Sequence, residues 1–519
     1  MMNAPGLPLT TALILAREAG VRHADLHAAI EKSLLLLRFY VGKGCVPYGD
    51  HPAWTQTGDD NGKNGIAAVM FHLAGEAEPA RFFSRMGVTS YGAERDCGHT
   101  GNFFNMLWAM PGVALSGPEA TGAWMKEFSW YYDLARRWDG TFRHQGAPEV
   151  EPDSYEGWDS TGAYLLAYTQ PLGKIHLAGK KPSLAGHVDA ATAASLIEDG
   201  RHWTPRKEDS AYAELSDAQL LTSLGSWSPV VRQRAAMEMP NRKTDFVPRL
   251  IALLEGHDLN PRLGACEALG KLAERGAAAV PALRKLLHAD DLWPRVCAAA
   301  ALGHIGEAAK PAAPEILEML VKGPDASDPR GMQQRYLIAA LFDEDAGLLT
   351  KSLEGVDHEA LSHAVRAGLQ NQDGHARSQI GTIYSRLSTE QIELLLPAIH
   401  EAIVKPAPSG EMFADGVRMS GLEILAKHRI KEGMALCLDL VELERWNENE
   451  RMTQCLEILQ IYGAAAKPML PRLKELQAAI VSKYEGQDRK DQLKPVLKAL
   501  ASIKSAKDAP ELRALPTAP

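Results

Sequence analysis

Polar residues that could carry out chemistry gather in three short segments of the N-terminal part of the chain. The first segment reads GDDNGKNG and contains Asp59, Asp60 and Asn64 just before a helical pattern. A carboxylate here could act as a general acid or base, or the loop could bind a substrate or a cation. Asp59 and Asp60 are therefore candidate catalytic residues, and Asn64 is a candidate ligand-binding residue. The alternative is a tight turn with an N-cap, since Asp and Asn side chains also bond to local backbone.

The second segment reads AERDCGHTGN and brings Asp96, Cys97, His99 and Asn102 close together in sequence. Asp, Cys and His are all zinc ligands, so Asp96, Cys97 and His99 form a candidate metal site. Asn102 is a candidate ligand-binding residue. Two alternatives stay open: Cys97 as a nucleophile with His99 as its base, and a capped helix start with a buried cysteine.

The third cluster is a pair of similar tripeptides, Trp138-Asp139-Gly140 and Trp158-Asp159-Ser160. An indole ring beside a carboxylate suits sugar binding, because the ring stacks on the pyranose and the carboxylate accepts from hydroxyl groups. Two carboxylates across a cleft could also hydrolyse a glycoside, which makes Asp139 and Asp159 candidate catalytic residues. In the alternative, the aspartates cap turns while Trp138 and Trp158 pack between helices.

The overall composition limits the functions that these clusters could serve. The chain has 519 residues, a formal net charge of -9 and 45% hydrophobic residues. An acidic chain does not favour a nucleic-acid-binding surface. The six cysteines include no CxxC pair, which argues against a disulfide framework or a structural zinc cluster.

The sequence also contains no membrane-spanning pattern. No apolar run reaches about 18 residues, so we expect no membrane insertion. The N-terminal segment runs from an apolar stretch directly into Arg17 and Glu18, which indicates a helix rather than a signal peptide. A cytoplasmic location is expected by default.

The distribution of aromatic residues divides the chain. Seven of the ten tryptophans precede residue 205, whereas the later part is built on Ala, Leu, Val and Pro. We therefore predict a helical domain over 1–185, a linker over 186–213, a repeat region over 214–505 and a flexible tail over 506–519.

Prolines recur at fixed spacing in the later part. Pro229, Pro261 and Pro294 are 32 and 33 residues apart, and Pro248, Pro281 and Pro314 follow in a second phase. Proline fits the first turn of a helix, so two phases predict two helices per repeat. Ser228 and Asn260 are the expected N-caps. The prediction is a stack of helical pairs, each burying its apolar face against the next.

These repeats resemble HEAT repeats of the short bacterial type. A late copy supports the resemblance, because Gly463-Ala-Ala-Ala-Lys-Pro468 matches Gly306-Glu-Ala-Ala-Lys-Pro311. HEAT solenoids offer a long surface to a protein partner. Arginines near the repeat starts (Arg232, Arg234, Arg262 and Arg295) are expected to pair with neighbouring repeats or to lie in solvent.

Helical patterns in the N-terminal part cover about 8–19, 22–41, 62–75, 98–110, 118–137 and 159–170. Several of them open with similar Gly-containing turns, and the segments WDGTFRHQG and YEGWDSTGAYLLAY resemble turns of the α/α-toroid fold. That fold occurs in terpenoid cyclases, prenyltransferase β-subunits and several carbohydrate-active enzymes. The fold prediction is thus all-α: a partial or complete α/α-toroid followed by a HEAT-type solenoid. Bacterial proteins with this domain order are also similar.

Three functional hypotheses follow. The first is an interaction scaffold that binds a protein through the solenoid and a ligand through the N-terminal domain. The second is a carbohydrate-active hydrolase or lyase with its site in the toroid mouth. The third is a zinc-dependent transferase of the prenyltransferase type, in which zinc is held by an Asp, a Cys and a His. The spacing there is Asp-x-Cys with a distant His, whereas Asp96 and Cys97 are adjacent here. The first hypothesis expects no cofactor.

The zinc hypothesis predicts a measurable metal content. If Asp96, Cys97 and His99 hold zinc, elemental analysis of the purified protein will find about one zinc per chain. The Cys97→Ala/His99→Ala double variant should then lose it. A wild-type protein without zinc would end this hypothesis.

Overall fold

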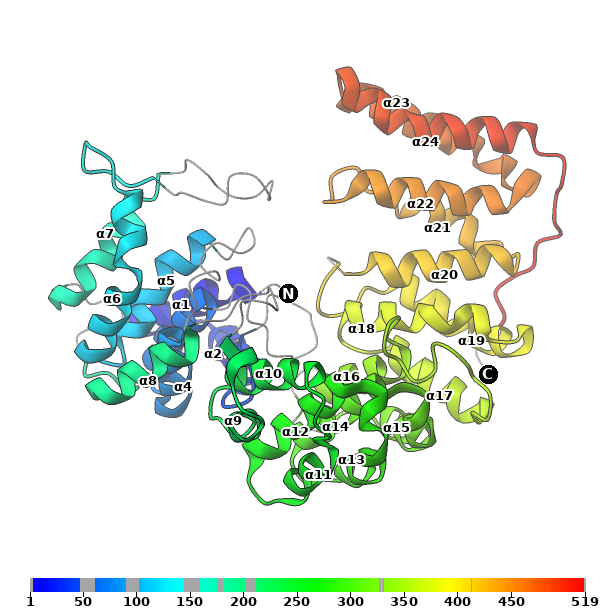
Figure 1. Ribbon diagram of the computed structural model, residues 1–519. Helices are drawn as coiled ribbons and strands as arrows, with labels where there is room; N and C mark the ends of the chain where they lie inside the picture. The colour runs from blue at the N-terminus through cyan, green and yellow to red at the C-terminus, as the bar shows by residue number, and fades with distance from the viewer. Residues whose placement is uncertain are drawn as a thin grey trace. The chain divides into compact units, whose positions relative to one another are not determined.

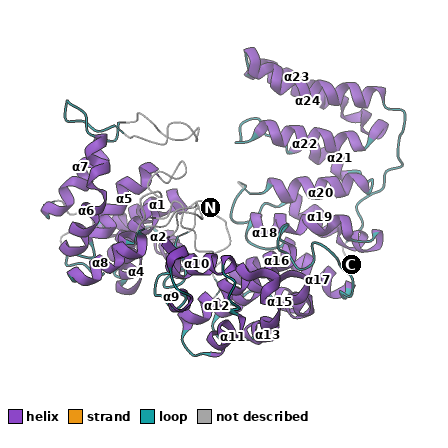
Figure 2. Ribbon diagram, in the orientation of Figure 1, coloured by secondary structure: helices purple, strands orange, loops and turns teal. Residues whose placement is uncertain are grey.

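The protein is helical throughout the part that its computed structural model describes, which covers residues 3–46, 61–89, 102–143, 159–174, 181–201, 211–325, 328, 331–411 and 413–517. Within these ranges extended pairing is limited to isolated bridges (Figure 2). The all-α, solenoid-like fold class predicted from the sequence is therefore confirmed. Closure of the N-terminal helices into a toroid stays a prediction.

The chain forms two compact units. Unit 1 comprises Met1–Ala301 and Ala326–Met332, and unit 2 comprises Leu302–Asp325 and Gln333–Pro519. The linker predicted over 186–213 falls inside unit 1. Within that unit, the Trp293 indole N–H donates to the Phe39 carbonyl at 3.0 Å, and Arg234 donates to the Asp199 carbonyl at 2.9 Å. These bonds join the aromatic-rich helices to the first repeats.

Among the residues that the structure describes, eight α-helices form the N-terminal part of unit 1. They are α1 (Asn3–Glu18), α2 (Ala24–Arg38), α3 (Asn61–Ala74), α4 (Ala77–Val88), α5 (Asn102–Ala114), α6 (Pro118–Ala135), α7 (Thr161–Thr169) and α8 (Ala190–Gly200) (Figure 1). Helix α3 contacts α1, α4 and α5. A Cβ atom on Gly112 would lie 2.3 Å from the Gly65 Cα, so the backbones of α3 and α5 touch because both residues are glycine.

Two of these helices were not predicted. Helix α4 buries Phe82, Phe83 and Met86 on one face, and it follows the turn at Gly75 where the predicted helix ends. Helix α8 lies inside the predicted linker, starts at the N-cap Asp189 and packs on α6. Its apolar residues are mostly alanine, which made the segment look like a connection.

The solenoid continues the chain as paired helices. They are α9 (Asp217–Ser223), α10 (Pro229–Glu238), α11 (Val247–Glu255), α12 (Leu259–Leu272), α13 (Val280–Leu286), α14 (Leu292–Ile305), α15 (Ala313–Lys322), α16 (Met332–Phe342), α17 (His358–Leu369), α18 (Gly374–Gln379), α19 (Thr389–Val404), α20 (Asp415–Lys427), α21 (Glu432–Asp439), α22 (Glu448–Ile461), α23 (Leu470–Lys483) and α24 (Gly486–Ser505). In unit 2, α18, α20, α22 and α24 stack in one row. The predicted first-turn prolines lie in the first turns of their helices.

The caps and turns refine these predictions. Ser228 caps α10, as expected, and accepts from the Val231 N–H. Asn260 does not cap α12: the N-cap is Asp258, and Asn260 lies inside the first turn. The two matched Gly-Ala-rich segments both form 3₁₀ turns that lead into the next helix, Gly306–Ala312 and Gly463–Met469. The late sequence copy therefore has the same backbone conformation as the earlier segment.

An arginine is the fourth residue of every second helix in the solenoid. In α10, α12, α14, α16, α18, α20, α22 and α24, respectively, these N4 arginines are Arg232, Arg262, Arg295, Arg335, Arg377, Arg418, Arg451 and Arg489. Side chains on a helix lean toward its N-terminus, so a residue at this position reaches back over the first turn.

Most N4 arginines donate to carbonyl groups of the loop just before their own helix. Arg232 bonds Ser226 at 2.7 Å, Arg377 bonds Asn371 at 2.6 Å, and Arg489 bonds Tyr484 at 2.6 Å. Arg451 bonds the carbonyls of Glu442, Arg445 and Trp446. Arg232 is fully buried and Arg451 is 1% exposed. Arg232 therefore does not lie in solvent, and it also donates to the Asn260 side chain of the next repeat at 3.4 Å.

The segment after α24 returns along unit 2 (Figure 1). The Asp508 carbonyl accepts from the Ala464 N–H at 2.7 Å, and Arg513 exchanges backbone bonds with Arg429 and Lys431 at 3.0 Å. The Arg513 guanidinium also pairs with Glu393. Residues 506–519 were expected to be flexible, but in the structure the described part of this segment bonds to three successive repeats.

Replacing an N4 arginine should destabilise the solenoid. In Arg451→Met, three loop carbonyls lose the buried guanidinium that donates to them while side-chain volume is nearly kept, so we expect the free energy of unfolding to fall by about 3 kcal/mol. Urea unfolding followed by circular dichroism measures this. The exposed Lys427→Met serves as control and should change stability by less than about 0.5 kcal/mol. Equal unfolding midpoints for the two variants would contradict the assigned role.

Candidate functional site

The third sequence cluster lies where α6 ends and α7 begins. The chain leaves α6, turns at Gly140 and pairs with itself through the antiparallel bridges Arg136↔Phe142 and Arg143↔Asp159. The Phe142 N–H donates to the Thr161 hydroxyl at 2.9 Å, and the Phe142 carbonyl accepts from the Ser160 N–H at 3.1 Å. Backbone pairing thus places Asp159 and Ser160 beside Phe142 and Arg143, which follow the turn at Gly140.

Asp139 and Asp159 each hold a turn through the threonine two residues later. Asp139 Oδ1 accepts from the Thr141 N–H at 3.0 Å and from the Thr141 hydroxyl at 2.6 Å, and Asp159 Oδ1 accepts from the Thr161 N–H at 3.0 Å. These threonine bonds lower the pKa of both carboxyl groups. Both carboxylates are fully exposed. The negative charge of Asp139 acts in the opposite direction and raises the pKa of Asp159, but the Thr161 bonds have the larger effect.

Trp138 stands beside this pair with its side chain in solvent. It is 93% exposed, whereas most aromatic residues of the preceding helix are buried. Trp124, Phe128, Tyr131 and Tyr132 form the core under α6, together with Tyr164 of α7. The alternative in which Trp138 packs between helices is therefore wrong. Trp158 lies outside the described residues.

The first two sequence clusters are only partly covered by the structure. Asp59, Asp60, Asp96, Cys97 and His99 lie outside the described residues, as does the side chain of Asn102, the first residue of α5. Asn64 is described and is 2% exposed, and its side-chain oxygen accepts from the Val46 N–H at 3.3 Å. That bond ties the segment after α2 to the start of α3.

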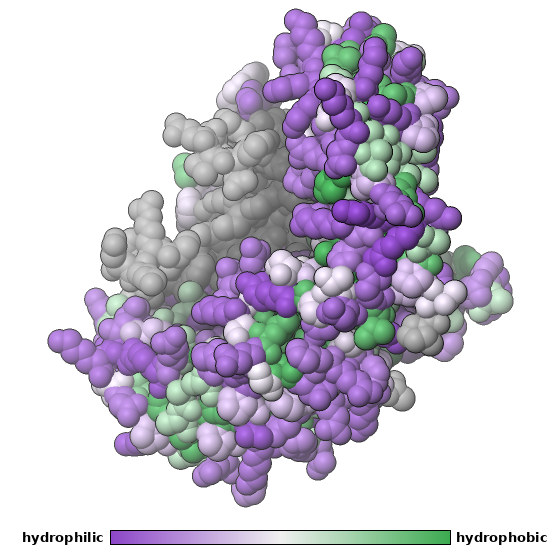
Figure 3. Space-filling model, turned by 90° about the vertical axis from the view of Figure 1, so that its right-hand side faces the viewer, coloured by the Kyte–Doolittle hydropathy of each residue, from purple (hydrophilic) through white to green (hydrophobic). Residues whose placement is uncertain are grey.

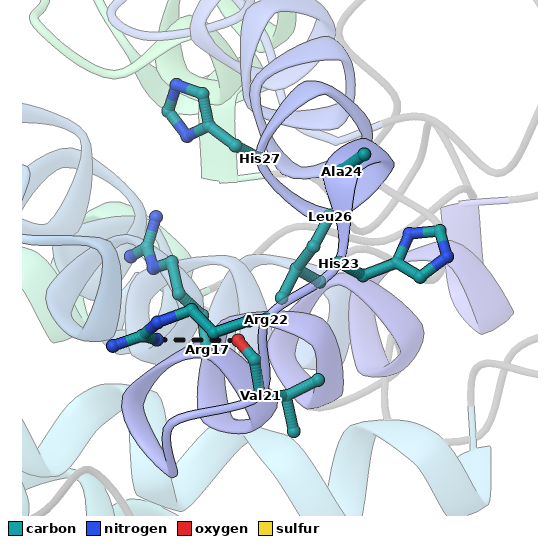
Figure 4. Close-up of a pocket in the computed structure, with 7 residues that line it drawn as sticks. All are labelled: Arg17, Val21, Arg22, His23, Ala24, Leu26 and His27. Carbon is teal, nitrogen blue, oxygen red and sulfur yellow. Dashed lines mark hydrogen bonds between the residues drawn. The ribbon is translucent and has the colours of Figure 1, made fainter.

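A shallow recess at the turn between α1 and α2 carries basic side chains that sequence reasoning passed over. It measures about 400 Å³ and is lined by Arg17, Val21, Arg22, His23, Ala24, Leu26 and His27. Figure 4 shows Arg17, Arg22 and His27 on one side of the turn, while His23 points to the other. Such a recess could attract an anion, although its basic groups are exposed to solvent and would bind weakly. The close spacing of Arg17, Arg22 and His27 around Gly20 was the available signal.

A buried carboxyl group lies in α12 of unit 1. Burial raises the pKa of Glu267 to about 7, against the opposing effect of Arg232. Burial also raises the pKa of the neighbouring Cys266 thiol to about 12, so this thiol is a poor nucleophile. In the described ranges no group of three or more His, Cys, Asp or Glu is placed to hold a metal ion.

Two family models match parts of the chain. Residues 1–179 match a domain of unknown function (DUF6288), and residues 218–295 and 262–334 match HEAT repeats. The second match confirms the HEAT prediction over 218–334. The first match covers the N-terminal helices and does not test the toroid prediction. A search of curated proteins finds no match. Among the described residues, no helix is long and apolar enough to cross a membrane.

Proposed function

We propose that this protein is an interaction scaffold that holds a protein partner on its solenoid. HEAT repeats generally mediate protein interactions, and the match over 218–334 supports that role here. The observation that carries the proposal is the series of N4 arginines, because these buried or half-buried side chains bind the loops between helices. Loops held in this way offer a partner a surface that costs little entropy to order.

The chemistry of the surface points to a polar interface. Figure 3 shows mostly hydrophilic side chains on one face, with small and separated hydrophobic ones. The exposed large apolar residues of unit 2 are scattered: Val321, Leu394, Val404, Trp446, Ile461, Val481 and Leu497. Recognition would then depend on a few apolar anchors and on charge, rather than on one large apolar patch.

Photocrosslinking in the source cells tests the scaffold. The photoreactive residue benzoylphenylalanine would replace Leu394, which is 51% exposed, or Leu497, which is 48% exposed, in the full chain. We expect a discrete adduct at one or both positions, and excess unmodified chain should abolish it while an unrelated protein should not. Adducts that are absent at both positions, or that persist under competition, would overturn the proposal.

A second proposal is that the α6–α7 turn binds carbohydrate. The observation that favours it is the exposed Trp138 indole beside two carboxylates that are held in place by Thr141 and Thr161. Hydrolysis would need one carboxyl group to hold a proton near neutral pH. Because the pKa of both groups is lowered, this pair suits binding of sugar hydroxyls better than the hydrolase or lyase reaction.

A glycan array with matched variants tests the carbohydrate proposal. Wild-type protein should bind at least one oligosaccharide class, and Trp138→Ala should weaken that binding roughly three- to tenfold through lost ring stacking. Trp130→Ala is the control, since Trp130 is also exposed (50%) but lies away from both aspartates on α6. Binding that survives Trp138→Ala unchanged would refute the assignment.

A further inference from the structure

One edge of unit 2 presents an aromatic residue from each of three successive repeats. Phe413, Trp446 and Tyr484 each lie directly before the N-cap of α20, α22 and α24, respectively. Figure 1 shows the turns before these three helices at the same end of the stack. We name Phe413, Trp446 and Tyr484 the aromatic edge. Because they share one position in the repeat, the stacking of repeats sets them in a row.

Arginine side chains bind the backbone carbonyls of the aromatic edge. Arg451 donates to the Trp446 carbonyl at 2.9 Å, and Arg489 donates to the Tyr484 carbonyl at 2.6 Å. Arg445 binds the Glu411 carbonyl at 2.9 Å and pairs with Asp415, which connects the loops before α20 and α22. The Tyr484 hydroxyl donates to the Leu443 carbonyl at 3.3 Å, which connects the next pair of loops. Trp446 is thus displayed on a fixed backbone.

The Trp446 side chain is exposed, unlike a tryptophan at the same repeat position in unit 1. In unit 1, Trp227 stands at the same place before α10 and packs against Phe82, with ring centroids 6.3 Å apart. The Trp446 side chain is 78% exposed, and its indole makes no hydrogen bond or ring contact with any residue that the structure describes. A large exposed ring on a fixed loop is poorly explained by packing of the repeat. It is well suited to act as an anchor for a partner.

The charge around Trp446 is acidic. The loop and helix start over 441–450 contain four glutamates and one arginine. The arginine, Arg445, already pairs with Asp415 and Glu442, and Glu444 pairs with Lys483 at 2.8 Å. Glu448 and Glu450, in the first turn of α22, have no basic partner among the described side chains. The Glu450 carboxylate accepts from the neutral Asn447 and Gln454 amides at 2.9 and 3.4 Å, so among the described side chains neither glutamate's charge is balanced by an ion pair.

We propose that the aromatic edge binds a basic, arginine- or lysine-containing segment of a protein partner. A cation would lie over the exposed Trp446 ring, and neighbouring basic groups would pair with Glu448 and Glu450. This inference rests on the proposed scaffold function and names the surface and the chemistry of the partner. An acidic segment or a nucleic acid would be repelled by the same charges.

Peptide binding to the full chain tests the aromatic edge. The probe is a fluorescein-labelled peptide of alternating arginine and glycine, and its counterparts carry citrulline or glutamate in place of arginine. Fluorescence anisotropy should show binding of the arginine peptide alone. Trp446→Ala should weaken it roughly two- to fivefold, and Trp446→Phe should restore part of the loss. Glu448→Gln/Glu450→Gln should also weaken it.

A charge-matched control separates this site from general attraction to an acidic protein. Glu354→Gln/Glu359→Gln removes the same charge from exposed positions at and just before the start of α17. We expect this control to bind like wild type. Equal losses in both glutamine variants, an unaffected Trp446→Ala, or no binding by wild type would overturn the aromatic edge. If the competable adducts at Leu394 or Leu497 persist in that case, the scaffold function stands and this surface alone is excluded.

Discussion

The bond between a buried guanidinium and the carbonyls of the preceding loop organises the repeat region. A solenoid must satisfy the polar groups of many short loops that are partly covered by neighbouring repeats, and an unpaired buried carbonyl is costly. The N4 arginine meets this need from within its own helix, because its side chain leans toward the helix start. The interaction also places a positive charge in the protein interior, as in the fully buried Arg232. This charge is stabilised because the guanidinium donates to several oxygen atoms.

Much of the repeat architecture could be read from the sequence, but its central interaction could not. Prolines indicated the phase of the repeats because proline is favoured in the first turn of a helix. Three of the N4 arginines were noticed near repeat starts, but alignment on the prolines did not show that they share one helix position. Pro229 is the first residue of α10, whereas Pro261 is the third residue of α12, so Arg232 and Arg262 stand at different offsets from their prolines. An alignment of the repeats on the first residue of each helix, rather than on the prolines, places all the N4 arginines at one position.

The candidate site was harder to anticipate for the same physical reason. An Asp-x-Thr pattern specifies a turn whether or not it serves a ligand, and Asp139 and Asp159 do hold such turns. What distinguishes this place is the exposure of Trp138, which depends on where α6 ends and not on the residue type. Trp446 carries the same lesson: a tryptophan before a helix packs in one repeat and lies in solvent in another.

The returning segment after α24 changes how the last repeats relate to one another. A solenoid held by neighbour contacts can lose its terminal repeat without disturbing the rest, since each interface is local. Arg513 instead reaches Glu393, 120 residues earlier in the chain, and passes two intervening repeats on the way. Fraying of the outermost pair would therefore have to break contacts on α19 and α21 as well. Because this segment ties the final repeats of a quasi-one-dimensional array together, we expect them to unfold as one cooperative block.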